Sequence, residues 1–185
     1  MRSMHSIFLL SGLWLSSLPA WAGGVAVVDF QMAINEVAEG EQARAALKAF
    51  EEQKQAEINS LEQQLAAKEQ QFESEVTTYQ SQVQMNILTP EARAQKEQQL
   101  GQIQNEYGLL QQQYQQTGMQ AEMELQQMYA EKMDAIISKM RVISESIAQE
   151  RELDMVYEVT ESGLVYIAPT VVDITPDLIR RYNGG

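Results

Sequence analysis

A narrow stripe of apolar side chains at helical spacing runs through most of the chain and constrains its fold more than any other feature. It starts at Leu47 and reaches Ile87 in steps of three or four residues, and a second stripe runs from Leu100 to Ile147 in the same way. This is the period of an α-helix rather than of a β-strand. Because so narrow a stripe must be covered by a partner helix, we expect two long helices that pack against each other.

The segment between the two stripes predicts a turn at residues 85–90. Thr89 can accept a hydrogen bond from the first free N–H groups of a new helix, Pro90 suits the first helical position, and Glu91 favours the positive end of the helix dipole. The connection is short, so the two helices should run in opposite directions. We expect an antiparallel coiled-coil hairpin over residues 36–147, an arm that projects ~80 Å at ~1.5 Å per residue.

Helix propensity is lowest about halfway along this arm. Gly118 interrupts the second helix, and a glycine costs ~1 kcal/mol relative to alanine. For a turn near Leu88, Gly118 should lie opposite Asn59 and Ser60, where propensity is also low. These two weak places predict bending in the middle of the arm.

Both ends of the chain are rich in β-forming residues. Residues 24–30 predict one strand, and residues 155–159 and 164–168 predict two more, joined by a turn that contains Gly163. A final helix should begin with Thr175 as its cap. The expected fold class is therefore α+β and mostly α, a small antiparallel β body with the helical arm inserted after its first strand.

The chain is expected to divide into three parts. Residues 1–22 have the pattern of a secretory signal peptide, with a basic start, a short apolar run and small residues before a cleavage site near Ala22. Residues 23–35 and 148–185 form the small β body, an oligomerisation unit, and residues 36–147 form the arm. The chain has no cysteine that could carry a lipid anchor, so a soluble product outside the cytoplasm is expected.

Few chemical groups remain for catalysis once the signal peptide is removed. The single histidine lies within the signal and the chain has no cysteine, which excludes the usual nucleophile pairs, zinc sites and disulfides. An enzyme would have to use carboxylates, such as Asp29, Asp154 and Asp173 in the body as candidate catalytic groups. Asp29 and Asp173 are instead expected to cap a strand end and a turn. We therefore expect no enzyme and no catalytic, cofactor-binding or metal-binding residues. The net charge of −13, or −14 without Arg2, disfavours nucleic acid as a partner.

A body of this size should need a partner to be stable. Three strands and one short helix bury little surface, and neither a disulfide nor a metal is available to help. Self-association is the remaining solution. The candidate oligomerisation residues are Val25, Val27, Val156, Val165 and Ile167.

The order and spacing of these segments resemble the Skp/OmpH family of periplasmic chaperones for outer-membrane proteins. The stretches that carry the resemblance are VAVVDF from Val25, LTPEA at the tip, MVYEV and LVYIA in the β body, and VDITPDLIRRYN from Val172. The resemblance implies a homotrimer whose bodies form a small β-core. It also implies that three arms enclose unfolded outer-membrane proteins and hold them soluble in the periplasm without ATP.

The apolar positions of the second helix become denser toward its end, which indicates either burial or an exposed methionine surface that adapts to varied partners. The candidate client-facing residues are Met119, Met123, Met133 and Ile137. Arg93 and Lys96 could form a basic patch at the tip. Several members of the family are strongly basic, whereas residues 41–88 here carry four basic and eight acidic side chains. The acidic charge leaves open whether lipopolysaccharide or a membrane surface is contacted, and we expect no stable membrane insertion.

The sequence also allows a second interpretation of the function. The chain could be a periplasmic structural adaptor or spacer whose coiled-coil arm docks one fixed partner. Protection of several unrelated unfolded β-barrel proteins from aggregation would separate a chaperone from such an adaptor.

Overall fold

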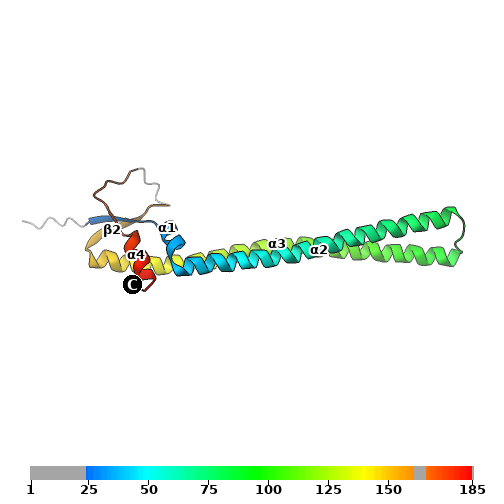
Figure 1. The fold of residues 1–185 in the computed structure, drawn as a ribbon, viewed down its shortest axis with the longest axis horizontal. Helices are drawn as coiled ribbons and strands as arrows, with labels where there is room; N and C mark the ends of the chain where they lie inside the picture. The colour runs from blue at the N-terminus through cyan, green and yellow to red at the C-terminus, as the bar shows by residue number, and fades with distance from the viewer. Residues whose placement is uncertain (1–23, 161–165, 185) are drawn as a thin grey trace, which may run out of the picture.

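The computed structural model of the chain describes residues 24–160 and 166–184. It shows a small body of strands and short helices at one end and a long two-helix arm that extends from it (Figure 1). The elements in chain order are β1 (Gly24–Val28), α1 (Phe30–Glu36), α2 (Ala38–Gln84), α3 (Pro90–Glu150), β2 (Leu153–Glu158), β3 (Val172–Asp173) and α4 (Thr175–Tyr182). The predicted α+β class, mostly helical and with the arm inserted after the first strand, is confirmed.

The arm consists of α2 and α3, which are antiparallel and meet at a tight turn. The side chain of Thr89 accepts a hydrogen bond from the backbone N–H of Ala92 at 3.2 Å, and Pro90 is the first residue of α3, as predicted. Within the turn, Asn86 has a positive φ of 53°, a conformation that asparagine tolerates better than most residues. At ~1.5 Å per residue, the 47 residues of α2 span about 70 Å.

The predicted apolar stripes form the seam between α2 and α3. Every stripe position from Leu47 to Val83 and from Leu100 to Ile147 is buried or half-buried, whereas Ile87 lies beyond α2 and is exposed. Lys54 and Lys68 lie within the first stripe, where they cover the seam with their alkyl stems and place their ammonium groups beside acids of α3. Among the described residues, the ion pairs between α2 and α3 are Lys54–Glu124 at 3.0 Å, Lys68–Glu106 at 2.5 Å, Lys96–Glu75 at 3.0 Å and, at the root of the arm, Lys139–Glu39 at 2.8 Å.

The sheet is parallel, and the prediction of an antiparallel body was wrong in this respect. The strand order is β2-β1-β3, and β1 pairs in parallel with both neighbours. The reason is that α3, with 61 residues, is longer than α2 and continues beneath the sheet before the chain turns into β2 (Figure 1). The chain therefore enters β2 at the end where β1 begins, and the whole arm acts as the long crossover connection that parallel strands require.

The third strand of the sheet also differs from the prediction. Residues 164 and 165 of the predicted strand lie outside the described residues, and residues 166–168 have no strand structure. β3 follows a few residues later and pairs with Ala26 and Val27 of β1. The composition of residues 164–168 favours a strand, but pairing partners depend on contacts that are distant in the sequence, and β1 takes the central position here.

The helices cover one face of the sheet and form the core with it. The buried core residues are Ala26, Val28, Ala33, Ile34, Val37, Ala43, Ile136, Met140, Ile147, Ile174, Leu178 and Tyr182. Five of them belong to the segment that the sequence assigned to the arm, namely Val37, Ala43, Ile136, Met140 and Ile147. The dense apolar positions near the end of α3 are thus explained by burial against the body of the same chain. The division of the chain at residue 147 stays a prediction.

A sharp elbow connects α1 to α2. Val37 has an extended backbone, with φ −81° and ψ 146°, which ends α1 and lets α2 start in a new direction. The guanidinium of Arg44 donates a hydrogen bond to the backbone carbonyl of Asn35 at 2.9 Å and so satisfies the end of α1. The side-chain oxygen of Asn183, just after α4, accepts from the backbone N–H of Ala38 at 3.1 Å. Both ends of the elbow are therefore held by distant side chains.

α4 fastens the root of the arm. The Tyr182 hydroxyl donates a hydrogen bond to Glu39, which also accepts from Lys139 at 2.8 Å, and the Lys139 ammonium lies 3.9 Å from the centre of the Tyr182 ring. The hydrogen bond from Lys139, followed by that from Tyr182, lowers the pKa of Glu39. Burial, followed by the bond to Glu39, raises the pKa of Tyr182. On the other side of α4, Arg181 makes two hydrogen bonds to Glu150 at 2.7 and 2.6 Å, which lower the pKa of Glu150 to about 2.

Gly40 allows α2 to start close to the end of α1, and its replacement is the first testable prediction. A Cβ atom at this position would lie 1.8 Å from the carbonyl oxygen of Ile34. Gly40→Ala should therefore lower the free energy of unfolding by at least ~1–3 kcal/mol, the usual cost of overpacking. The measurement is thermal unfolding followed by far-ultraviolet circular dichroism.

Gly108→Ala in α3 is the matched control for this substitution. A Cβ at Gly108 would meet no atom within 4 Å, so the better helix propensity of alanine should stabilise the protein by ~1 kcal/mol. Equal effects of the two substitutions would contradict the close approach assigned to Gly40.

Candidate functional site

The face of the sheet that points away from the helices is apolar. Val25 lies beside Met155 and Val27 beside Tyr157 in the pairing of β1 with β2, and none of the four belongs to the core cluster beneath the sheet, although Val27 is only 8% exposed. Val25, Met155 and Tyr157 are 43%, 45% and 41% exposed. We call these four residues the open face. Apolar side chains that are grouped in this way on a small body mark a surface for association.

The structure separates the predicted oligomerisation residues. Val25 and Val27 lie on the open face, whereas Val156 points to the opposite side of the sheet and packs against the core. Ile167 is 40% exposed and follows the gap in the described residues, and Val165 lies within that gap. The candidates therefore do not form one surface in a single chain.

Met155 and Tyr157 are members of the open face that the sequence did not reveal. A register shift between Gly24 and Val25 in the pairing of β1 with β2 makes Leu153 and Val156 both face the core, although simple alternation would place them on opposite faces. Such a shift depends on the partner strand. Only the parallel register places these two side chains beside Val25 and Val27.

The predicted client-facing residues share one side of α3, because their spacings are close to multiples of the helical repeat of ~3.6 residues. Met119 and Met123 are 60% and 63% exposed on the arm. Met133 and Ile137 are partly buried and pack against the core. The methionine surface is thus exposed along the arm and covered at its root.

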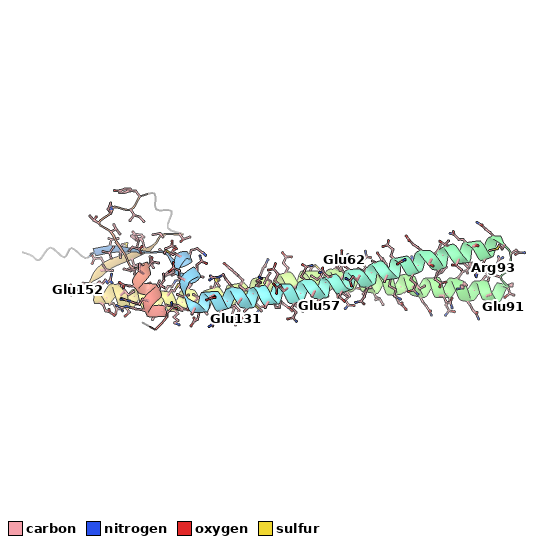
Figure 2. The ribbon with its side chains drawn as sticks, viewed as in Figure 1. Glu57, Glu62, Glu91, Arg93, Glu131 and Glu152 are labelled. Carbon is pink, nitrogen blue, oxygen red and sulfur yellow. The ribbon has the colours of Figure 1, made fainter. Side chains whose placement is uncertain are left out.

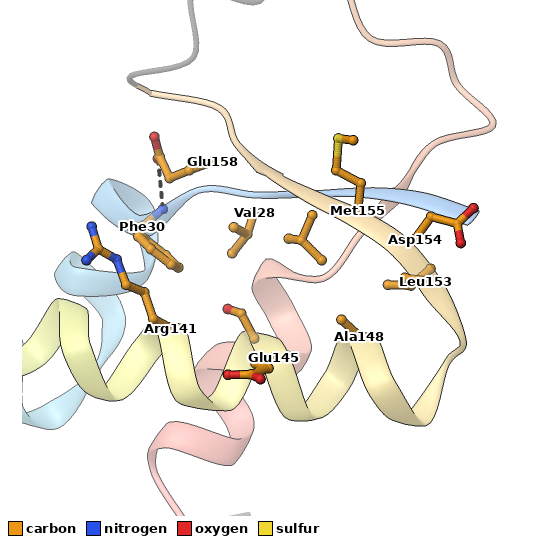
Figure 3. Close-up of a pocket in the computed structure, with 11 residues that line it drawn as sticks. Val28, Phe30, Arg141, Glu145, Ala148, Leu153, Asp154, Met155 and Glu158 are labelled. Carbon is orange, nitrogen blue, oxygen red and sulfur yellow. Dashed lines mark hydrogen bonds between the residues drawn. The ribbon is translucent and has the colours of Figure 1, made fainter. Parts of the chain in front are cut away.

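Beyond Ile137 the same side of α3 borders a hollow beneath β2 (Figure 3). The hollow has a volume of about 360 Å³ and apolar walls from β1 and β2, with Arg141, Glu145, Asp154 and Glu158 among its charged residues. The carboxylate of Glu158 accepts from the backbone N–H groups of Phe30 at 3.4 Å and Thr160 at 3.1 Å. Its role is to hold the chain where β1 passes into α1.

Two of the three candidate catalytic carboxylates act as caps. Asp29 accepts from the backbone N–H of Met32 at 2.7 Å, at the start of α1, and Asp173 accepts from the backbone N–H of Thr175 at 2.8 Å, at the start of α4. The hydroxyl of Thr175, predicted to cap α4, instead accepts from the backbone N–H of Asp29 at 2.9 Å. Asp154 is exposed at the rim of the hollow.

Residues 24–160 and 166–184 contain no group of three or more histidine, cysteine, aspartate or glutamate side chains placed to hold a metal ion. Within the same ranges, no helix is both long enough and apolar enough to cross a membrane.

The tip carries a mixture of charged and apolar side chains, and Glu91 and Arg93 lie there together (Figure 2). Lys96 pairs with Glu75 across the arm at 3.0 Å, and Arg93 donates to the side-chain oxygen of Asn86 at 3.2 Å. Met85 and Ile87, beside Asn86, are 61% and 63% exposed. Because Glu75 neutralises Lys96, the predicted basic patch reduces to Arg93.

Comparison with known proteins agrees with this architecture. The sequence profile of the outer membrane protein (OmpH-like) family matches residues 24–182. The chain belongs to the OmpH-like family. The resemblance inferred from the sequence is thereby confirmed.

The OmpH-like chain also shares its fold with a crystal structure of an OmpH-like protein from Caulobacter crescentus CB15, which is proposed to be an outer membrane chaperone. The TM-score is 0.63 at 15% sequence identity, over 99% of this chain and 89% of the other. No curated protein sequence matches the OmpH-like chain.

The open face generates a prediction about self-association. Val27 is only 8% exposed, so Val27→Asp should place a charge in a buried position and yield monomers with poorly folded bodies. Val25 is partly exposed in the single chain, so Val25→Asp should leave the body folded and still abolish assembly. Mass in solution by light scattering, together with circular dichroism, measures both effects.

The control for these substitutions is Val142→Asp, which adds the same charge at a position of α3 that is 68% exposed. It should keep both the mass and the helicity of the unchanged protein. A Val25→Asp variant that keeps the full assembled mass would show that the open face is not the interface.

Proposed function

We propose that this OmpH-like protein is an ATP-independent periplasmic holdase chaperone, with no enzymatic activity, that keeps unfolded outer-membrane proteins soluble between the arms of a homotrimer. The observation that carries the proposal is that the long arm has no enclosed site of its own in the part of the chain that the structure describes. Its apolar stripes are buried or half-buried in its own seam, and Lys54, Lys68 and Lys96 are paired with acids of the opposite helix. The arm therefore offers other molecules its length and its outer surface rather than an enclosed site.

The open face supports the trimeric part of the proposal. Helices cover the opposite side of the sheet, so contact between the open faces of several copies would complete a second layer of core. The arms start at the same body and would then extend side by side. An assembly of this kind surrounds a space that a single arm cannot enclose.

The exposed methionines support the binding of varied clients. Met119 and Met123 lie on one side of α3 and have flexible, polarisable side chains that adapt to different apolar partners. The fold shared with the Caulobacter protein, which is proposed to be an outer membrane chaperone, also agrees with this function. An adaptor for one fixed partner would gain little from such an adaptable surface.

The central test combines mass measurement with an aggregation assay. We expect a trimer that gains the mass of one unfolded outer-membrane protein and that suppresses the aggregation of several unrelated unfolded β-barrel proteins. Deletion of matched helical segments around the tip should keep the trimer and weaken the holding of large clients first. A protein that binds one folded partner and leaves aggregation unchanged would instead be an adaptor, and a deletion that dissociates the trimer would assign assembly to the arms.

The charge of the chain predicts an unusual response to salt. With a net charge of −13, or −14 without Arg2, the protein should repel an acidic client at long range and hold it through short-range apolar and amide contacts. At ~0.15 M salt, screening limits interactions between exposed charges to a range of roughly 8 Å and so removes this long-range repulsion. Affinity for an acidic unfolded outer-membrane protein should therefore stay constant or rise between low and moderate salt, with the larger change in association rate.

Titration of a labelled acidic client at several ionic strengths measures this response. A clear fall in affinity with rising salt would mean that a local cation dominates despite the overall charge. Arg93→Gln then identifies the source, because Lys96 is already paired with Glu75.

A further inference from the structure

A shallow groove runs along one side of the arm between α2 and α3. It consists of two adjoining hollows of about 410 and 190 Å³ that share Glu51 and Leu125. Leu47 and Tyr129 line its end nearer the body, and Ile58 and Gly118 line its far end. We call this feature the mid-arm groove. From Leu47 to Ile58 it extends ~16 Å, the length of about five residues of extended chain.

Gly118 keeps the far end of the groove open. A Cβ atom at this position would meet no atom within 4 Å, so the space above the glycine is empty of side chains. Ile58 of α2 lines the same hollow and is half-buried. The low-propensity position that the sequence showed in the middle of the arm is therefore also the position where the seam has room for another apolar side chain.

Two carboxylates border the apolar floor from opposite helices. Glu51 of α2 and Glu122 of α3 both line the smaller hollow and are exposed. Among the residues that the structure describes, neither of them takes part in an ion pair. Their charges are therefore available to a bound molecule.

Among the residues that the structure describes, Lys54 is the only cation that lines the groove, and it is already paired. Lys54 lies 3.0 Å from Glu124 and 3.9 Å from Glu57, and its ammonium is 5.4 Å from the centre of the Phe50 ring. The hydrogen bond to Glu124 raises the pKa of Lys54, so it stays charged and paired. Glu57 and Glu62 lie at nearby positions along the arm, on its lower and upper edges in Figure 2. The groove thus combines an apolar floor with a surplus of negative charge.

We propose that the mid-arm groove binds unfolded segments in which a large apolar side chain is flanked by lysine or arginine. The apolar side chain fills the space beside Gly118 and Leu125, and the flanking cations pair with Glu51 and Glu122. Charge complementarity of this kind selects between partners more strongly than it adds affinity. The proposal rests on the chaperone function proposed above and adds the class of segment that the arm selects.

A pair of synthetic peptides tests the charge preference. Each contains a central Phe-Phe, flanked on both sides by lysines in one peptide and by glutamates in the other, and each carries a fluorescent label. Fluorescence anisotropy with the intact protein at low salt should show the lysine peptide binding at least ~tenfold tighter, which corresponds to ~1.4 kcal/mol. The Glu51→Gln, Glu122→Gln double variant should lose most of this preference and keep its helicity.

A glycine pair tests the location. Gly118→Leu should fill the far end of the groove and weaken binding of the lysine peptide at least ~tenfold. Gly101→Leu is the matched control, because Gly101 is also half-buried in α3 and has no atom within 4 Å of a Cβ, yet does not line the groove. It should leave peptide binding unchanged.

Equal binding of the two peptides overturns the proposal, and so does an equal loss for Gly118→Leu and Gly101→Leu. The aggregation assay separates this outcome from failure of the chaperone function. If the protein suppresses aggregation but shows no peptide preference, the groove proposal is refuted and the proposed chaperone function stands. If the peptide preference depends on Gly118 but the protein does not suppress aggregation, the groove remains a peptide-binding site and the proposed chaperone function is refuted.

Discussion

The packing of α2 against α3 is the contact on which the rest of this molecule depends. Neither helix has an apolar surface wide enough to be buried on its own, and the narrow stripe of one covers that of the other along the arm. Since α3 is longer than α2, the same packing extends α3 beneath the sheet and determines where the chain enters β2. The direction of the sheet, the position of the core and the side on which the open face lies all follow from this difference in length.

The body has one covered and one uncovered side. The end of α3, together with α1 and α4, closes the inner side of the sheet, and ion pairs and caps hold these helices together. On the outer side, Val25, Met155 and Tyr157 remain partly exposed. This asymmetry supports the proposed association, in which contact between open faces would add to the small core of each body.

The features that the sequence predicted well depend on residues that are close in the chain. The helical spacing from Leu47 to Val83, and the Thr89 cap followed by Pro90, are local patterns, and the structure reproduces them residue by residue. The parallel pairing of β1, the role of Gly40 and the outward positions of Met155 and Tyr157 depend on segments far apart in the chain. No local pattern encodes them. Thr175 illustrates the difference, because its hydroxyl accepts a hydrogen bond from the backbone N–H of Asp29, just after β1, instead of capping its own helix.

Continuity of α3 between body and arm has a mechanical consequence. The elbow at Val37 separates α2 from α1, but α3 runs unbroken from beneath the sheet to the tip. The buried side chains of Ile136, Met140 and Ile147 fix this end of α3 in the body, so the arm is rigidly attached at its root. An arm attached in this way does not rotate as a whole about its root, and its tip moves when the helices bend along their length. A bend of ~5° at Gly118 displaces the tip by ~4 Å, because about 28 residues of helix at ~1.5 Å each lie beyond it. In the proposed assembly, the distance between the tips of neighbouring arms would therefore change by bending near Gly118, where a Cβ atom would meet no neighbour within 4 Å, rather than by rotation at the root.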